Sequence, residues 1–175
     1  MDLAKHPDKQ KKLQLELDAA FPDKNTRATL NEVNKLDYLN MCIKETMRLW
    51  PVAGAGSGRT IAQEFEYKGF RYLKGEVAIL QFYSMFRQPW IHQANEYVPE
   101  RWDAASNPQI KELNDMFMPF ALGPRNCIGM NMAQMQLKLV TAACLRHFSF
   151  ALAPEQHKGG TEVDFEYFLT LKPKA

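Results

Sequence analysis

The longest regular pattern in the sequence covers residues 128–148, and it limits most strongly how the chain can fold. Its polar residues keep to a narrow stripe, marked by Asn131, Gln134 and Lys138, while most other positions hold Met, Leu, Ala or Val. A helix with so wide an apolar surface is typical of a core element. We therefore expect a helix over 128–148 that is mostly buried.

Two shorter helices are predicted on the N-terminal side of this segment. One begins at His6-Pro7, where a proline suits the first helical turn, and it ends at Phe21-Pro22. The other covers residues 36–50, because apolar residues recur there three or four positions apart and Pro51 follows. The recurring apolar residues are Leu13, Leu17 and Ala20 in the first helix and Leu36, Leu39, Ile43, Met47 and Trp50 in the second.

Strands are expected to be short. Residues 51–60, with three glycines in five positions, should form a flexible connection. Strands at 65–72 and 77–82, separated by Lys74-Gly75, would pair as a hairpin, and residues 163–171 favour a final strand or hairpin. Residues 85–119 have no sustained periodicity, and a loop of this length is usually functional or wrapped around something large.

The predicted fold is therefore mainly α with small β-hairpins. A chain of 175 residues, 46% hydrophobic and 24% charged, can bury one core, so we expect one domain or part of one. The formal net charge of +2 gives no field of one sign that would attract nucleic acid. No apolar run approaches the ~20 residues of a membrane-spanning helix, and residues 1–20 lack the apolar core of a signal peptide.

The three cysteines, Cys42, Cys127 and Cys144, are odd in number and widely spaced. This supports neither a disulfide framework nor a C-x-x-C zinc or redox site, and it fits a reduced, intracellular chain. A free cysteine is usually a small buried hydrophobe, which is our interpretation of Cys42 and Cys144. Taken alone, Cys127 would be interpreted in the same way.

The surroundings of Cys127 favour a second interpretation, as a thiolate ligand. Cys127 lies where an irregular loop meets the long helix, so amides and the helix dipole would lower the pKa of its thiol. Gly123 permits a tight turn, and Gly129 would let the helix backbone lie close to a flat ligand. Arg125 could pair with an acidic group at the ligand's edge, and Phe120 could cover the sulfur.

Residues 120–129 match the signature Phe-x-x-Gly-x-Arg-x-Cys-x-Gly at every defined position, and here the sequence resembles the cytochrome P-450 family. The resemblance implies that the Cys127 thiolate is the axial ligand of a haem iron, the cofactor being haem b, iron protoporphyrin IX. It also implies that Phe120, Gly123, Arg125 and Gly129 take part in binding the haem.

Two further segments resemble motifs of the same family. Residues 44–51 resemble its Glu-x-x-Arg helix, and residues 99–102 resemble the Pro-x-Arg-aromatic segment. The resemblance implies that Glu45, Arg48 and Arg101 form one buried ion network with a structural role. A buried charge without its partner costs several kcal/mol, so losing one member should disrupt the fold.

The resemblance also implies positions around the cofactor. Arg59 stands where the family usually places an arginine that binds a haem propionate, and the final segment resembles the family's last β-hairpin. The expected substrate-lining residues are Val52, Ala53, Gly54, Ala55, Tyr167 and Phe168. Gly54-x-Gly56 follows a helix, so it does not fit a dinucleotide-binding loop.

The resemblance covers nearly the whole chain. It implies that residues 1–175 are the C-terminal haem-thiolate portion of one P-450 domain, without the N-terminal part. The implied function is monooxygenation of a small lipophilic substrate with dioxygen and electrons from a reductase; family members are often bound to the endoplasmic reticulum membrane. No catalytic acid can be named in the chain, and the alternative is a truncated haem-binding or inactive fragment.

Overall fold

The N-terminal helices lie where the sequence predicts them in the computed structural model, which describes residues 2–56, 58–152, 165–167 and 171–173. After the short α1 (Asp2–Lys5), helix α2 (Pro7–Ala20) has its proline at the first turn and ends before Phe21-Pro22. A capping box between Thr29 and Glu32 opens α3 (Leu30–Val33). Helix α4 (Asp37–Leu49) ends just before Pro51, as expected from the steric effect of a proline on the preceding residue.

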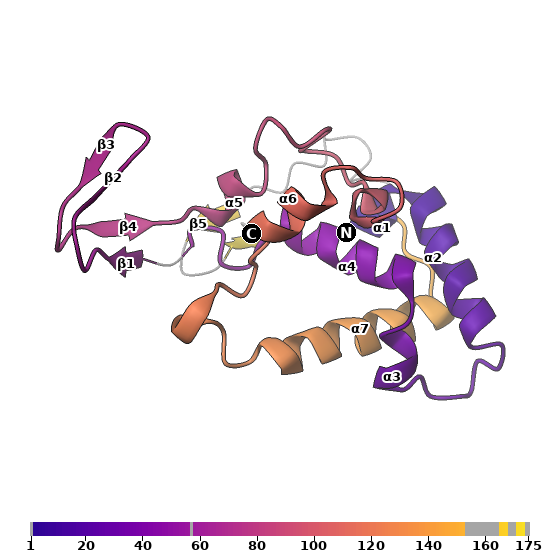
Figure 1. Cartoon of the computed structure of the whole chain (residues 1–175). Helices are drawn as coiled ribbons and strands as arrows, with labels where there is room; N and C mark the ends of the chain where they lie inside the picture. The colour runs from indigo at the N-terminus through magenta and orange to yellow at the C-terminus, as the bar shows by residue number, and fades with distance from the viewer. Residues whose placement is uncertain (1, 57, 153–164, 168–170, 174–175) are drawn as a thin grey trace.

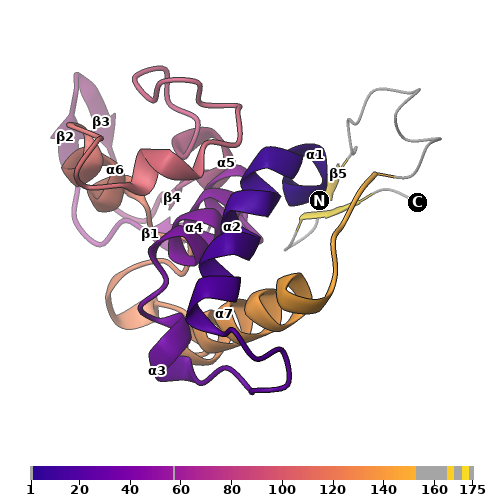
Figure 2. The same cartoon turned by 90° about the vertical axis from the view of Figure 1, so that its right-hand side faces the viewer.

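The core forms where α2, α4 and the C-terminal half of α7 (Met130–His147) meet (Figures 1 and 2). Its buried residues include Leu13 and Leu17 of α2, Leu39 of α4, and Ala142 and Leu145 of α7. Leu13, Leu17 and Leu39 are the residues that recur in the predicted helical patterns, so the apolar periodicity identified the faces that pack together.

The prediction that the long helix is mostly buried is wrong. Helix α7 begins at Met130, two residues later than predicted, and its buried residues are Ala142, Leu145 and Arg146. Met132 and Val140 remain 61% and 59% exposed, because only the C-terminal half of α7 meets α2 and α4. An apolar pattern shows that a face is suited to burial, but it does not show what covers it.

The predicted pairing of the strands is also wrong. Residues 65–72 form a hairpin by themselves, in which β2 (Phe65–Tyr67) pairs with β3 (Phe70–Tyr72). Lys68 and Gly69 form its turn with φ of +51° and +80°, the left-handed pair that a two-residue hairpin requires. Strand β4 (Val77–Ile79) pairs instead with β1 (Gly58–Thr60), inside the segment predicted to be a flexible connection. Figure 1 shows the β2–β3 hairpin standing away from the helices.

Short helices interrupt the region predicted to be irregular. They are the 3-10 helix η1 (Pro99–Trp102) and α6 (Ile110–Met116), and α5 (Phe82–Met85) comes immediately before this region and overlaps it only at Met85. The 3-10 turn η2 (Gly123–Arg125) lies in the cysteine loop, and the C-terminal hairpin predicted near residue 165 is present as β5 (Phe165–Tyr167) and β6 (Leu171–Pro173). The class, mainly α with small antiparallel strand pairs, agrees with the prediction. Within the described residues, no helix has the length and apolar character needed to cross a membrane.

Candidate functional site: a cysteine loop and a buried ion network

The carboxylate of Glu45 is the centre of a buried network. Arg48 donates to it from Nε and Nη2 (both 2.9 Å), and Arg101 donates from Nε to Oε1 (2.9 Å). The indole of Trp102 donates to Oε2 (3.0 Å) and the amide of Val98 to Oε1 (2.9 Å). Five hydrogen bonds therefore converge on one carboxylate, which is fully buried. The structure brings together Glu45, Arg48 and Arg101, the three residues that the resemblance had grouped.

The two arginines extend this network to the chain that follows α5. Their remaining N–H groups are satisfied by backbone carbonyl oxygens, as the geometry of a guanidinium fork allows. Arg48 Nη1 donates to the carbonyls of Phe86 (2.8 Å) and Ala94 (2.6 Å), and Arg101 donates to those of His92 (2.7 Å) and Gln93 (3.0 Å). The network thus holds residues 86–101, which lack strands and long helices, against α4.

A second set of contacts fixes the C-terminal end of α4. The indole of Trp50 donates to both carboxylate oxygens of Asp2 (3.1 and 3.0 Å), which joins α1 to the end of α4. Arg87 donates to the carbonyl of Leu49, and its guanidinium lies 3.8 Å from the centre of the Tyr83 ring. Pattern reasoning missed these positioning residues, because their partners lie 38 or more positions away in the sequence.

Cys127 lies in an exposed loop, three positions before the first residue of α7. Its amide donates to the carbonyl of Phe120 (2.9 Å), which closes the loop, and its own carbonyl accepts from the amide of Met130 (3.2 Å). Because Cys127 is exposed, the interpretation as a small buried hydrophobe does not hold. Phe120 is only half-buried and, in the described part of the chain, does not keep Cys127 from solvent.

The two glycines of the loop differ in what they permit. Gly123 has φ +75°, a left-handed conformation that a residue with a side chain rarely adopts, and so it sets the turn in front of Cys127. A β-carbon at Gly129 would lie 3.9 Å from Cys127 Sγ, so glycine leaves the space beside the sulfur open. Arg125 is exposed in the turn between them.

A cavity of about 510 Å³ lies between α4 and α7, and Val52 and Phe120 both line it. The other expected substrate-lining residues of the connection, Ala53, Gly54 and Ala55, do not line this cavity. Arg59 is half-buried in β1 and donates to the carbonyl of Gly58 (3.0 Å). Tyr167 lies in β5, and Phe168 falls outside the described residues.

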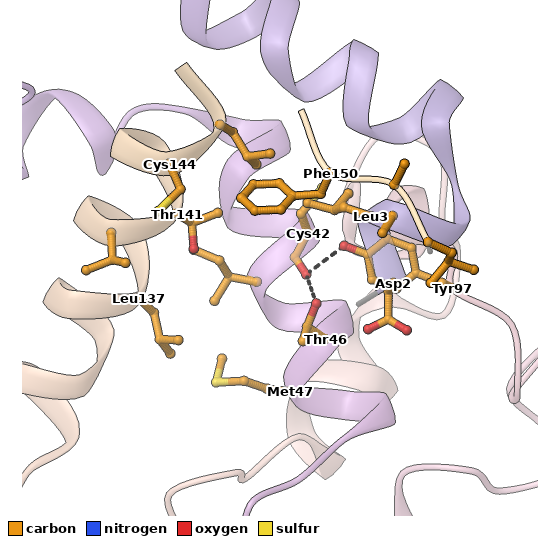
Figure 3. A pocket seen from close by; sticks show the side chains of 16 residues that line it. Asp2, Leu3, Cys42, Thr46, Met47, Tyr97, Leu137, Thr141, Cys144 and Phe150 are labelled. Atoms are coloured by element: carbon orange, nitrogen blue, oxygen red, sulfur yellow. Dashed lines mark hydrogen bonds between the residues drawn. The ribbon is translucent and has the colours of Figure 1, made fainter. Parts of the chain in front are cut away.

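The other two cysteines line an adjoining cavity of about 530 Å³, which shares Thr46, Met47 and Leu137 with the first (Figure 3). Cys42 is buried on α4, and Cys144 is half-buried on α7, across the cavity. Burial raises the pKa of the Cys42 thiol to about 12, which keeps it protonated and unsuited to metal binding. Among the described residues, no group of three or more His, Cys, Asp or Glu side chains could hold a metal ion. Cys127 is the one of the three cysteines whose side chain is exposed.

The comparisons with known proteins decide the family. A family model described as Cytochrome P450 matches residues 1–175. The chain belongs to the cytochrome P450 family. Cytochrome P450 3A6 of Oryctolagus cuniculus is 37% identical over 155 residues, which are 87% of this chain and 30% of that protein. Cytochrome P450 3A9 of Rattus norvegicus is 39% identical over 149 residues (85% and 29%). Putative cytochrome P450 CYP13A3 of Caenorhabditis elegans is 35% identical over 157 residues (89% and 29%). This P450 chain thus spans about 30% of the length of these relatives.

Members of the P450 family use haem as their cofactor, and the residues of the cysteine loop fit that group. The accessible thiol supplies the soft donor that an iron porphyrin takes from one protein residue. Leu122, Ile128 and Met132, all within five positions of Cys127, carry exposed apolar side chains, which suits a macrocycle that is mostly apolar. Arg125 adds an exposed positive charge that could pair with a propionate.

Proposed function

We propose that this chain is the haem-binding portion of a haem-thiolate monooxygenase, with Cys127 as the axial ligand of the iron. The observation that supports the proposal is the accessible thiol of Cys127, in a P450 cysteine loop that turns at Gly123 and is closed onto Phe120. When bound, haem would supply the redox centre at which dioxygen is used to hydroxylate an organic, lipophilic substrate. Residues 1–175 would then belong to a single P450 domain as its C-terminal portion.

The residues of this chain would bind and orient the haem. Cys127 would hold the iron, Arg125 and Arg59 would pair with propionates, and Gly123 and Gly129 would let the loop approach the porphyrin closely. Phe120 would help to position the ligand, because its carbonyl accepts the amide proton of Cys127. Exposed apolar side chains next to the loop would be covered, which favours binding by about 25 cal/mol per Å² of apolar surface.

The ion network would keep the loop in place without touching the reacting atoms. Glu45, Arg48 and Arg101 attach residues 86–101 to α4, and α4 packs against the α7 helix that follows the loop. We further propose an electron-donating reductase and dioxygen as partners of the full reaction. Val52, which lines the 510 Å³ cavity, would contact the substrate, together with Ala53, Gly54, Ala55, Tyr167 and Phe168.

Spectroscopy of the chain with added haem tests the ligand assignment. The chain, reduced under carbon monoxide, should give the strongly red-shifted Soret band of a thiolate complex, and Cys127→Ser should abolish that band. Cys144→Ser is the matched control, because it changes a cysteine of α7 that lies outside the loop and should leave the band unchanged. Identical spectra for wild type and Cys127→Ser, with far-ultraviolet circular dichroism showing both folded, would refute the assignment. No observation on the described residues favours the alternative of an inactive haem-binding fragment.

A further inference from the structure

Two lysines line a cavity that lies beside the cysteine loop. The cavity has a volume of about 280 Å³ and lies between α4, α7 and residues 117–122. Lys44 of α4 and Lys138 of α7 both line it, and no carboxylate does. Because the residues are 94 positions apart, the fold and not the local sequence brings the two positive charges together.

The charge of Lys44 lacks a counter-ion in the described part of the chain. Its Nζ makes no ion pair or hydrogen bond there, and it lies over the Trp102 ring, 5.2 Å from the ring centre. Loss of solvent around the half-buried side chain, and then repulsion by Lys138, lower the pKa of Lys44. A lysine in this situation is stabilised by any anion that approaches it.

Lys138 leaves part of its donor capacity free. Its Nζ donates to Asn34 Oδ1 (2.8 Å), and an ammonium group has three protons to donate. The side-chain amide of Gln134, in the same lining, makes no hydrogen bond with the described residues and could donate as well. Two lysines and one glutamine therefore line the same space, and each has a side-chain group that can donate to an anion.

The rest of the wall is apolar. Phe117, Met118, Phe120, Leu122 and Met130 line the cavity. Ala121, also in the lining, has φ +59°, a conformation that costs energy for a residue with a side chain, and its amide closes a turn onto the Met118 carbonyl (2.9 Å). Strained residues of this kind concentrate at ligand-binding sites.

We propose that this cavity binds a small amphiphilic carboxylate, with the anion between Lys44 and Lys138 and the apolar tail against Phe117 and Phe120. The volume lies at the lower limit of small-molecule sites, so the ligand has on the order of ten heavy atoms. A monovalent carboxylate fits better than a phosphate, because a half-buried site with apolar walls removes water from the anion, and this costs less for one charge than for two. The site contains neither Cys127 nor Arg125, but it shares Phe120 and Leu122 with the cysteine loop, so the haem-free chain is the form in which to test it.

Titration of the haem-free, full chain with octanoate tests this proposal, with binding measured by isothermal titration calorimetry. Octanoate should bind saturably, and octanol, which has the same tail without the charge, should bind at least tenfold more weakly. Lys44→Met should weaken octanoate binding at least tenfold. Lys111→Met is the matched control, because Lys111 is an exposed lysine of α6 that does not line the cavity. This variant should bind octanoate with the affinity of the wild type.

Lys138→Met provides a second variant on a different helix, in case Lys44→Met disturbs the neighbouring Glu45. It should also weaken octanoate binding, with circular dichroism confirming that it is folded. The proposal is overturned if octanoate does not saturate, if octanol binds equally well, or if folded Lys138→Met binds octanoate as the wild type does. The carbon monoxide spectrum of the haem-loaded chain is a separate measurement, so failure of this site leaves the Cys127 assignment untouched.

Discussion

Replacing Glu45 by Gln should be the most damaging conservative substitution in the chain. The shape of the side chain is kept, but the negative charge that two buried arginines share is removed. The carboxylate accepts five hydrogen bonds, whereas an amide has one oxygen to accept with and an NH₂ group that would face the donors of Arg48 or Arg101. Neither arginine can reach solvent easily, since their side chains are 0% and 7% exposed.

The magnitude follows from the cost of an uncompensated buried charge. Removing one partner of a buried ion pair costs about 3–5 kcal/mol, and here one carboxylate serves two arginines. We therefore expect Glu45→Gln to lower the free energy of unfolding by at least about 4 kcal/mol, a large part of the 5–15 kcal/mol typical of a native protein. With a urea m-value of about 2 kcal/mol/M, the midpoint of unfolding would fall by about 2 M.

Urea unfolding followed by far-ultraviolet circular dichroism measures this change, and Glu100→Gln is the matched control. Glu100 also pairs with two basic residues, Lys9 and Lys12, but its side chain is 39% exposed. An exposed pair contributes about 0–1 kcal/mol, so the control should shift the midpoint by less than about 0.5 M. Equal shifts for Glu45→Gln and Glu100→Gln would show that the network does not stabilise the fold as argued.

Three further predictions concern stability. Gly56→Ala should lower the free energy of unfolding in urea by more than about 3 kcal/mol, because its β-carbon would lie 1.5 Å from the carbonyl oxygen of Leu80. Gly75→Ala is the control: its backbone is also left-handed but the space around it is open, so it should cost about 1–2 kcal/mol. Leu39→Ala, at a fully buried position, should lower the free energy of unfolding by about 2–5 kcal/mol. Its control, Leu15→Ala, lies at a position 57% exposed and should lower it by less than about 0.5 kcal/mol. Burial raises the pKa of Glu100, but hydrogen bonds from Lys12 and Tyr38 outweigh this effect and lower the pKa to about 2. The ionised Glu100 therefore stabilises the folded chain fully above the ordinary pKa of 4.5, and this stabilisation is lost as the pH falls toward 2. Because Glu100 is partly exposed, we discount this effect to about 1 kcal/mol. In urea unfolding at a series of pH values, the free energy of unfolding should fall by about that much more in the wild type than in Glu100→Gln, and an equal fall in both would contradict the prediction.

The helices were predictable where a local pattern and a stop signal agree. Leu13 and Leu17 in α2 and Leu39 in α4 repeat at helical spacing, and a proline follows each helix within two residues. The hairpin was mispredicted because Lys68-Gly69 is a weaker turn signal than Asn-Gly, and its left-handed backbone is visible only in the structure. Helix α6 was missed because Leu113 is its one buried residue, too few for a periodic pattern.

The site was predictable only as residue types and not as geometry. The Cys127 loop is continuous in the sequence, so its motif could be identified directly. The contact between Glu45 and Arg101 spans 56 positions, so no local pattern predicts it, and it was expected only from the resemblance of two separate segments to motifs of the family. Lys44 and Lys138 each look like a solvated surface lysine until the fold places them at one cavity.

The five bonds to Glu45 also determine when the chain can fold during its synthesis. Arg101 and Trp102 leave the ribosome 56 and 57 residues after Glu45, which at about 5–20 residues per second means a delay of about 3–11 s. During this interval α4 can form, but burying Glu45 beside Arg48 alone would leave the carboxylate with unfilled acceptor sites. The network therefore cannot be completed in the nascent chain until residue 102 has emerged. The apolar face of α4 that carries Leu39 stays open longer still, because its partners Ala142 and Leu145 belong to α7.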